Sequence, residues 1–319
     1  MAGVTSALLG VAAGLYGRAW EARRAAYARG WFAPARIEAR VASIGNLTVG
    51  GAGKTTLALY LAQRAREQAL DVAVVCRRYH PGPSGTGDEE MMYRAAVGET
   101  RTFAGTSKRD LATQAAAAGA KLVIVDDGFS HWALARDVDV VLLDASDLWG
   151  GERLLPAGRL REPRRALQRA HAVVVSRLSP GEDPAPWLER VRPYAPAALL
   201  AAGRHRVTGV RDADERQVEA RGPAHVVTAT GNAQAVARTA REAGFDPVTL
   251  AAYRDHHWFS AGEARAEIAR AGAGTLLVTA KDAVRWPAAA GRRPCVLEVA
   301  WEWCAGGDAV ERLVLGEGA

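Results

Sequence analysis

Cysteine is scarce in this sequence of 319 residues, and its placement excludes the frameworks that are usually built from it. Cys76, Cys295 and Cys304 are odd in number, and none has a neighbour at the spacing of a zinc cluster or a disulfide scaffold. We therefore expect a reducing compartment and no structural metal cluster.

Long apolar runs are also missing. A membrane-spanning helix needs about 18 consecutive apolar residues. The most apolar stretch, from Val4 to Tyr16, is shorter and contains two glycines. Its positive charges follow it rather than precede it, which is the reverse of a secretory signal. The sequence therefore predicts neither a membrane span nor export.

Lysine is the third scarce feature. Only four of the 41 basic residues are lysine, at positions 54, 108, 121 and 281, and the others are arginine. A lysine in such a chain therefore suggests a specific use. The formal net charge of +6 is modest, and no RNA- or DNA-reading motif accompanies it, so we expect no nucleic-acid partner.

What is present is ordinary globular composition, with 49% hydrophobic and 24% charged residues, in a length typical of two domains. Residues 1–35 predict an amphipathic N-terminal helix, because Leu8, Val11 and Leu15 recur at helical spacing before a group of arginines. Two interpretations stay open. The helix lies on an anionic membrane surface, with aromatic residues such as Trp20 at headgroup level, or it packs on the protein's own core.

Short β-branched runs alternate with helical stretches after this helix. Apolar strands separated by helices form parallel sheets that are buried on both faces, so residues 36–176 predict such a domain. Its expected strands are 40–44, 71–76, 121–125, 138–143 and 172–176, and its expected helices are 54–68 and 108–118.

A second series predicts a smaller α/β domain over residues 223–319. Its expected strands are 225–229, 275–279 and 295–299, and its expected helices are 233–243 and 261–271. Residues 177–222 are rich in proline, glycine and arginine. They predict a linker with a hairpin around residues 207–218.

A glycine-rich loop follows the first predicted strand and runs into a helix at Lys54. Backbone N–H groups of such a loop surround an oligophosphate, and the helix N-terminus adds its positive dipole. Lys54 would reach the β- and γ-phosphates, and the Thr55 hydroxyl would bind Mg²⁺. The match to the P-loop pattern is imperfect at its first glycine. The predicted nucleotide-binding residues are Thr48, Val49, Gly50, Gly51, Ala52, Gly53, Lys54, Thr55 and Thr56.

Two carboxylates, Asp126 and Asp127, follow the third predicted strand. At that end of a doubly wound sheet they lie beside the phosphate loop and can hold Mg²⁺ directly or through water. An aspartate after a strand is also a common turn residue, so the pair by itself is weak evidence for a metal site. It becomes strong evidence together with the phosphate loop. Together they predict a P-loop NTPase-like domain with a metal site at Thr55, Asp126 and Asp127.

Asp88 and the run Asp255-His256-His257 each have several interpretations. Asp88 follows a loop-forming stretch and opens an apparent helix. It is either a helix cap, which its spacing favours, or a carboxylate that takes a proton from an acceptor hydroxyl. The histidines could bind a metal, pack in the core or act as acid-base groups. Adjacent histidines point to different sides, which disfavours a shared metal.

These residues resemble the tetraacyldisaccharide 4′-kinase family of lipid A synthesis. The resemblance extends in order along nearly the whole chain. It rests on the segments 43–55, 87–89, 125–129, 154–158, 160–163, 255–257 and 279–284. Such a series is far more specific than the phosphate loop by itself.

The resemblance implies ATP-dependent, Mg²⁺-requiring phosphorylation of the 4′-hydroxyl of a tetraacylated glucosamine disaccharide 1-phosphate, giving lipid IVA. It implies two α/β/α domains joined by a strand pair, with the active site between them. It also implies a peripheral protein that acts as a monomer on the cytoplasmic face of the bacterial inner membrane.

The resemblance also assigns roles to single residues. Asp88 becomes the proton acceptor rather than a cap, His256 orients it, and Lys54 completes the catalytic set. Arg161, Glu162 and His131 are expected to bind the substrate. The arginines between positions 153 and 169 are further candidates for contacts with the membrane and the 1-phosphate. Outside Arg161, a solvated helix face is an equally open interpretation of this stretch.

Four positions depart from the family pattern. Arg78 and His80 replace two glycines, Ser130 replaces a glutamine, and Glu90 replaces a proline. These changes affect the nucleotide and acceptor loops, so substrate identity or turnover could differ even where the fold does not.

Two other classes of function stay open at this point. A P-loop ATPase or GTPase switch or metallochaperone would hydrolyse nucleotide without a lipid acceptor, and the missing Asn-Lys-x-Asp motif disfavours the GTP version. A non-enzymatic module would bind membranes or polyanions through the excess of basic residues. Its binding would be unaffected by Lys54→Ala.

Overall fold

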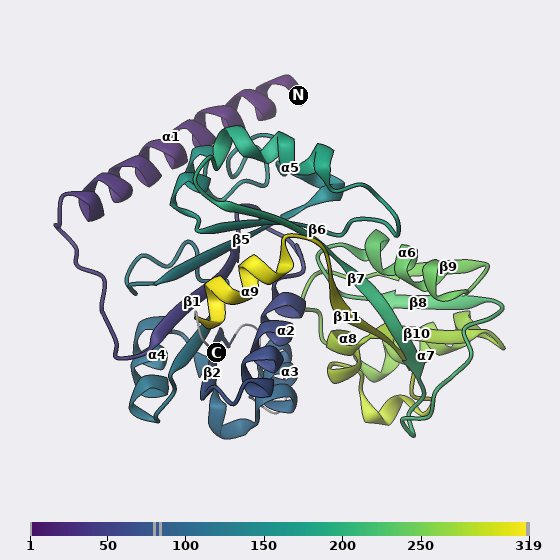
Figure 1. Ribbon diagram of the computed structural model, residues 1–319. Coiled ribbons are helices and arrows are strands. Elements are labelled where there is room, and N and C mark those ends of the chain that lie inside the picture. The colour runs from purple at the N-terminus through teal and green to yellow at the C-terminus, as the bar shows by residue number, and fades with distance from the viewer. Residues whose placement is uncertain (1, 79–80, 83–84, 317–319) are drawn as a thin grey trace. The chain divides into compact units, whose positions relative to one another are not determined.

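The computed structural model describes residues 2–78, 81–82 and 85–316 (Figure 1). Backbone contacts divide the chain into two compact units. Unit 1 comprises Met1–Arg77, Ala96–Arg204 and Glu302–Ala319, and unit 2 comprises Arg78–Ala95 and His205–Trp301. The predicted α/β fold class is confirmed.

Unit 1 is a parallel sheet in the order β3-β2-β4-β1-β5-β6-β7. Its strands are β1 (Arg40–Asn46), β2 (Val72–Arg77), β3 (Thr102–Gly105), β4 (Leu122–Asp126), β5 (Val138–Asp144), β6 (Ala172–Ser176) and the start of β7 (Leu199–Arg211). Its helices are α1 (Ala2–Ala28), α2 (Lys54–Glu67), α4 (Lys108–Ala117), α5 (Ala185–Val191) and α9 (Gly307–Leu315).

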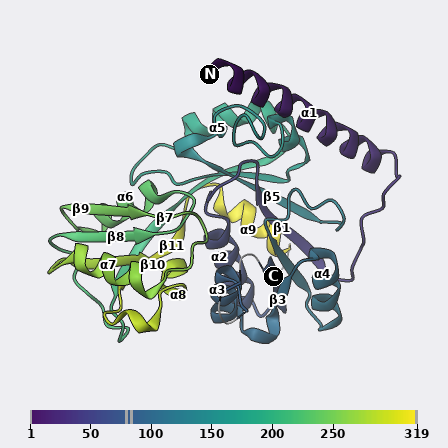
Figure 2. The same ribbon diagram turned by 180° about the vertical axis from the view of Figure 1, so that it is seen from behind.

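Helices cover both faces of this sheet. Strand side chains alternate between faces, and α4 packs on Val41, Val75 and Val123 while the intervening residues are equally buried. Helix α2 contacts β1, β2 and β4. Figure 2 shows α4 next to β3. Burial on both faces explains why these strands are nearly continuous apolar runs, as expected for a parallel sheet.

Unit 2 is a smaller layered α/β body with strand order β11-β10-β8-β9, again parallel. Helix α6 packs with Val226 and Leu277, whereas α7 packs with Val227 and Leu276, so the two helices lie on opposite faces (Figure 1). Its elements are α3 (Asp88–Val97), β8 (Ala224–Thr228), α6 (Ala233–Ala243), β9 (Val248–Ala252), α7 (Ala261–Ala271), β10 (Thr275–Thr279), α8 (Ala280–Val284) and β11 (Cys295–Ala305).

The junction differs in part from the domain boundaries that the sequence predicts. Strands β7 and β11 are neighbours in the sheet order and each runs from one unit into the other, as the expected strand pair does. Residues 302–319, which include the end of β11, belong to unit 1 rather than to the C-terminal domain. Within unit 1, Tyr60 and Arg64 of α2 donate to Glu311 of α9 at 2.5 and 3.1 Å. Residues 78–95 likewise belong to unit 2.

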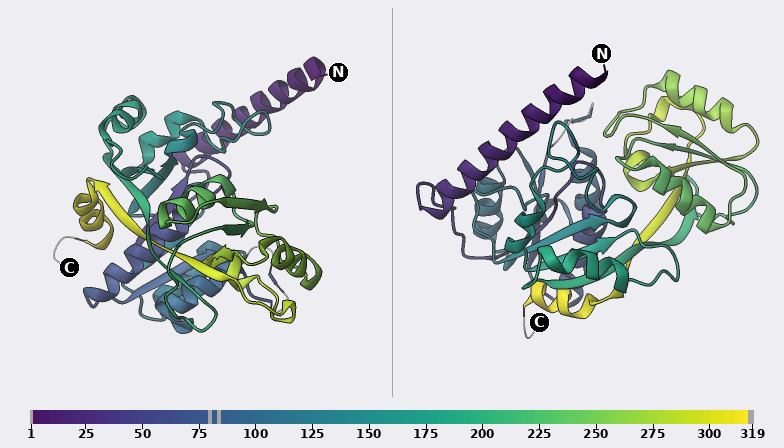
Figure 3. Two further views of the ribbon diagram at one scale, coloured as in Figure 1. Left: turned by 90° about the vertical axis from the view of Figure 1, so that its right-hand side faces the viewer. Right: turned by 90° about the horizontal axis from the view of Figure 1, so that it is seen from above.

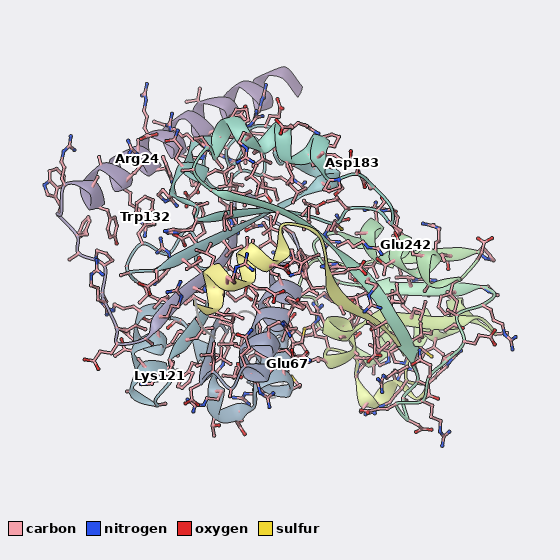
Figure 4. All side chains as sticks on the ribbon, in the orientation of Figure 1. Arg24, Glu67, Lys121, Trp132, Asp183 and Glu242 are labelled. Carbon is pink, nitrogen blue, oxygen red and sulfur yellow. The ribbon has the colours of Figure 1, made fainter. Side chains whose placement is uncertain are left out.

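The N-terminal helix has one buried and one exposed face. Helix α1 runs along one flank of unit 1 (Figure 3), where Ala13, Trp20 and Ala26 are buried. Trp20 packs edge-on against Trp132, which Figure 4 shows beneath α1. The expectation that Trp20 lies at headgroup level is therefore wrong, because the core of unit 1 covers its ring.

Candidate active site

The phosphate loop joins the end of β1 to the start of α2, and its geometry follows from its glycines. Gly53 has a φ of 86°, a conformation that favours glycine. Gly45 lies so close to Phe129 that an added Cβ would come within 2.4 Å of the Phe129 Cβ. Helix α2 has no side-chain cap, so its first N–H groups are open to an anion.

Neighbouring segments brace this loop. Arg177 donates two hydrogen bonds to the Gly51 carbonyl, at 3.0 and 2.6 Å, and the Ser176 hydroxyl donates to the Ala52 carbonyl at 2.8 Å. Thr48, which replaces the first glycine of the usual pattern, is buried and bridges to Leu160. The backbone of the loop is therefore held before any ligand binds.

Asp127 lies beside the loop lysine, as the sequence predicts for the carboxyl end of this strand. The register of β1 with β4 pairs Ile44 with Asp126, and the Asp127 N–H donates to the Ile44 carbonyl at 2.8 Å. The Lys54 ammonium is 3.6 Å from Asp127, and Arg161 donates to both carboxylate oxygens at 2.7 and 2.8 Å. Burial opposes ionisation, but Lys54 and Arg161 hold the pKa of Asp127 well below its usual range.

A buried lysine that the sequence left without a role supports the same turn. Lys108, at the start of α4, donates to the Asp126 and Asp127 carbonyls at 2.7 and 2.6 Å. Burial lowers its pKa, and the two aspartates partly oppose that shift. Lys108 therefore holds the backbone of the turn that carries both carboxylates.

The donor atoms near the loop suit Mg²⁺ in chemistry. Thr55, Asp126 and Asp127 offer only oxygen, which Mg²⁺ prefers, and such a site typically uses one or two carboxylates together with substrate phosphates. Within the described ranges, no three His, Cys, Asp or Glu side chains form a cluster that could hold a metal by themselves.

Asp88 and His256 meet in unit 2, although 168 positions separate them in the sequence. Asp88 is the first residue of α3, and its side chain is 4% exposed. His256 Nδ1 lies 3.0 Å from Asp88 Oδ2. The backbone of His256 has a φ of 61°, an uncommon conformation for a residue other than glycine that is frequent at functional sites.

Two further cations surround the same carboxylate. Lys281 Nζ and Arg285 Nε, both from the region of α8, lie 3.6 and 3.5 Å from Asp88 Oδ2. Burial raises the pKa of Asp88, but the hydrogen bond from His256 and the charges of Lys281 and Arg285 lower it to about 2. An ionised carboxylate only accepts hydrogen bonds, so His256 Nδ1 is the donor.

The three residues expected to bind the substrate, Arg161, Glu162 and His131, have different surroundings in unit 1. Arg161 is bound to Asp127 and Asn46, and Glu162 is buried and accepts from Arg169 at 2.9 Å. Burial, then the nearby charges of Lys108 and Arg136, lower the pKa of His131 to about 4. His131 is therefore neutral at pH 7, and its buried Nε2 has no hydrogen-bond partner among the described residues.

Several arginines expected to contact the membrane are instead used within unit 1. Arg169 lies 4.3 Å from the ring centroids of Phe129 and Trp132. Arg164 lies 4.7 Å from the Trp149 ring and pairs with Glu152 at 2.8 Å. These contacts place the guanidinium groups of Arg164 and Arg169 against aromatic rings of unit 1.

Two of the four departures from the family pattern form an ion pair with each other. Arg78 donates to both carboxylate oxygens of Glu90 at 2.8 and 2.9 Å, and Glu90 also accepts from the Gly87 N–H at 3.3 Å. The pair thus joins Arg78 to the first turn of α3, which also carries Asp88. His80 lies outside the described residues, and nothing in the structure explains the serine at position 130.

Three of the four lysines lie at the candidate sites, as their scarcity suggests. Lys54 and Lys108 support Asp127, and Lys281 contacts Asp88. The remaining lysine, Lys121, has an exposed side chain beside α4 (Figure 4). The roles of Lys108, Lys281 and Arg285 follow only from the structure.

A parallel sheet with a glycine-rich loop, a loop lysine and strand-end carboxylates defines a P-loop phosphotransferase fold. A family model described as LpxK, tetraacyldisaccharide-1-P 4′-kinase, matches residues 5–315. The chain belongs to this family. The predicted membership is confirmed, and with it the predicted class, an ATP-dependent kinase of lipid A biosynthesis.

Individual relatives agree with the family model. The chain is 37% identical over 322 residues to the tetraacyldisaccharide 4′-kinase of Anaeromyxobacter dehalogenans (strain 2CP-C), covering 91% of this chain and 84% of that one. It is 32% identical over 303 residues to the enzyme of the same name from Geobacter sulfurreducens, covering 88% and 84%.

A solved structure shares the fold. The crystal structure of LpxK from Aquifex aeolicus in complex with ATP superposes with a TM-score of 0.72 at 21% identity, covering 97% of this chain and 98% of that one. The two other classes left open by the sequence, the nucleotide switch and the non-enzymatic module, are not supported by these matches.

Proposed function

We propose that the protein transfers the γ-phosphate of ATP to the 4′-hydroxyl of a tetraacylated glucosamine disaccharide 1-phosphate, with the residues described above in defined roles. The observation that carries this proposal is the buried Asp88 carboxylate, hydrogen-bonded to His256 at 3.0 Å, in a chain that also contains an uncapped phosphate loop. Lys281 and Arg285 also lie near this carboxylate, and a residue that only capped a helix would not require them.

In this proposal unit 1 binds the triphosphate. The loop N–H groups and Lys54 bind the phosphates, and Arg161 keeps Asp127 oriented. Thr55 with Asp126 and Asp127 would hold Mg²⁺. When bound, the ion would neutralise charge on the β- and γ-phosphates. Arg161, Glu162 and His131 are our candidates for contacts with the substrates.

Asp88 acts mainly by orienting the acceptor hydroxyl. A carboxyl with a pKa of about 2 is ionised at neutral pH, so it is always ready to accept a hydrogen bond but is a weak base. Phosphoryl transfer passes through a loose transition state that needs little deprotonation of the nucleophile beforehand. A carboxylate that stays ionised and accepts a hydrogen bond from the substrate hydroxyl therefore suits this reaction.

Transfer is tested directly by incubating the purified protein with [γ-³²P]ATP, Mg²⁺ and acylated glucosamine disaccharide 1-phosphate. We expect label in the lipid, dependent on Lys54. Release of labelled inorganic phosphate at the same rate with and without lipid would instead support a nucleotide hydrolase. A non-acylated disaccharide 1-phosphate serves as the acceptor control.

We further propose that α1 attaches the protein peripherally to the anionic inner membrane, on its cytoplasmic face. Leu8, Val11 and Leu15 are 66%, 65% and 60% exposed, and Trp31 and Phe32 beyond the helix are 71% and 57% exposed. Exposed apolar side chains beside arginines suit the headgroup region of anionic lipid. Among the described residues, no helix is long and apolar enough to cross a membrane.

The membrane proposal is tested with vesicles containing anionic lipid. The triple variant Leu8→Ser, Val11→Ser, Leu15→Ser should lose most vesicle binding while it keeps its thermal unfolding temperature, because these side chains are exposed. Leu199→Ser, which alters an exposed leucine of β7, is the matched control. Undiminished binding by the triple variant would contradict the proposal.

A further inference from the structure

Four residues from three segments of unit 2 contact the carboxylate of Asp88. His256, from the turn after β9, lies at 3.0 Å, and the Glu89 N–H of α3 donates to Asp88 Oδ1 at 2.8 Å. Lys281 of α8 and Arg285, the residue after α8, approach Oδ2 at 3.6 and 3.5 Å. Of the acidic groups nearby, Glu89 accepts from Lys281 at 3.0 Å, and Asp255 lies 3.9 Å from His256 Nε2.

Arg285 connects this carboxylate to a buried aspartate. Its side chain is fully buried, and it donates to Asp282 at 2.8 Å and to the Ala229 carbonyl at 3.1 Å. Asp282 in turn accepts from the Ala229 N–H at 2.9 Å. A buried guanidinium with several fixed partners has little freedom to move, so its position relative to Asp88 is set by the fold.

The same network supports the histidine. The Ala229 carbonyl that accepts from Arg285 also accepts from the His256 N–H at 3.1 Å. Asp282 is further fixed by the hydroxyls of Thr228 and Thr279, each donating at 2.7 Å. The buried hydrogen-bond network of Ala229, Asp282 and Arg285 therefore determines the positions of both Asp88 and His256.

Lys281 differs from Arg285 in one useful respect. Its side chain is 17% exposed, and its hydrogen bond goes to Glu89 rather than into the core. Burial lowers its pKa, but the charges of Glu89, Asp88 and Asp255 outweigh this effect and raise it, so it is a cation at neutral pH. It can be replaced without opening the core of unit 2.

We propose that Lys281 and Arg285 are positioning residues for phosphoryl transfer, which hold the Asp88 carboxylate ionised and aligned beside His256. The proposal rests on the role of Asp88 proposed above. Both residues act through Asp88 and contribute no atom to the reaction. Their removal should therefore reduce kcat and leave the KM values for ATP and lipid nearly unchanged.

The test is a double-mutant cycle between Lys281 and Asp88, measured as kcat and KM on the full-length protein. We expect Lys281→Met to lower kcat about tenfold, with both KM values changed less than twofold, and Lys281→Arg to restore most of the rate. In the Asp88→Asn background, Lys281→Met should cause no further loss. Lys121→Met, at an exposed lysine, is the matched control and should behave as the wild type.

Each outcome of the cycle distinguishes the two proposals. If Asp88→Asn retains the normal rate, the role of Asp88 fails, and this inference fails with it. If Asp88→Asn is slow but the losses multiply in the double variant, Lys281 acts independently of Asp88 and the inference alone is overturned. A raised KM for either substrate in Lys281→Met would likewise overturn it in favour of direct substrate binding.

Discussion

The phosphate loop and the Asp88 cluster reach similar electrostatic arrangements from very different sequence patterns. In unit 1 a carboxylate, Asp127, is held by Lys54 and Arg161, and in unit 2 Asp88 is held by Lys281, Arg285 and His256. Both carboxylates stay ionised because neighbouring cations outweigh the effect of burial.

The two regions differ in how the chain supplies these groups. The phosphate loop itself is one contiguous segment between a strand and a helix, and Asp127 and Arg161 join it from other parts of the chain. Phosphate binding by the loop therefore depends mainly on local geometry. The Asp88 cluster combines three segments, around positions 88, 256 and 281, that only the folding of unit 2 brings together. A contiguous site is therefore visible as a pattern, whereas an assembled site looks like an ordinary cap, turn or helix.

The largest effect is expected in the contiguous site. Lys54→Ala should lower kcat/KM about 10³-fold or more, because it removes a charge that stabilises both bound phosphate and transition state. The measurement is initial-rate kinetics of lipid phosphorylation. Lys121→Ala is the control, and wild-type kinetics for Lys54→Ala would contradict a phosphate-binding role for the loop.

The assembled site should show a smaller and more selective effect. Asp88→Asn should lower kcat about 10²-fold, the usual cost of misplacing a reacting group, because a neutral amide orients the acceptor hydroxyl less firmly, and ATP affinity should be unchanged. Asp214→Asn, at an exposed turn of unit 2, is the control. A near-normal kcat for Asp88→Asn would restore the interpretation of Asp88 as a helix cap.

The ionisation of Asp88 should also appear in stability. Its folded pKa of about 2 lies below the reference value of 3.8, so its ionised form stabilises the fold above pH 4, and this contribution is lost as the pH falls toward 2. The difference in unfolding free energy between wild type and Asp88→Asn should therefore shrink by about 2 kcal/mol over that interval. Urea unfolding at several pH values measures it, and a constant difference would contradict the assigned pKa.

The smallest effect concerns the pair of residues that departs from the family pattern. Arg78→Ala should reduce the unfolding free energy by about 1 kcal/mol, because its partner Glu90 is buried but keeps Arg94 as a second cation. In the Glu90→Gln background, Arg78→Ala should reduce the unfolding free energy by less than it does in the wild type. Urea unfolding of the four proteins of this double-mutant cycle measures the difference. Arg216→Ala, at an exposed arginine of unit 2, is the control. Additive losses would show that the two departures are unrelated.

The sequence predicted the central elements better than the peripheral ones. The five inner strands of unit 1 are continuous apolar runs because both faces are buried, and these runs gave their positions. Strands β3 and β9 stand at the ends of the sheet order, and their residues are mostly only partly buried, so the same signal was absent. Helix α9 was also missed, and its place on α2 depends on Glu311 contacts far away in the chain.

By itself, the sequence determined the α/β class, the family and the phosphate loop, because each of these is encoded in local order along the chain. The tertiary structure alone decided that Trp20 faces the core, that Lys108 supports the turn with both strand-end carboxylates, and that Lys281 and Arg285 adjoin Asp88. The physical reason is that charge interactions depend on distance in space, and burial sets their strength. Neither quantity is written in the spacing of residues along the chain.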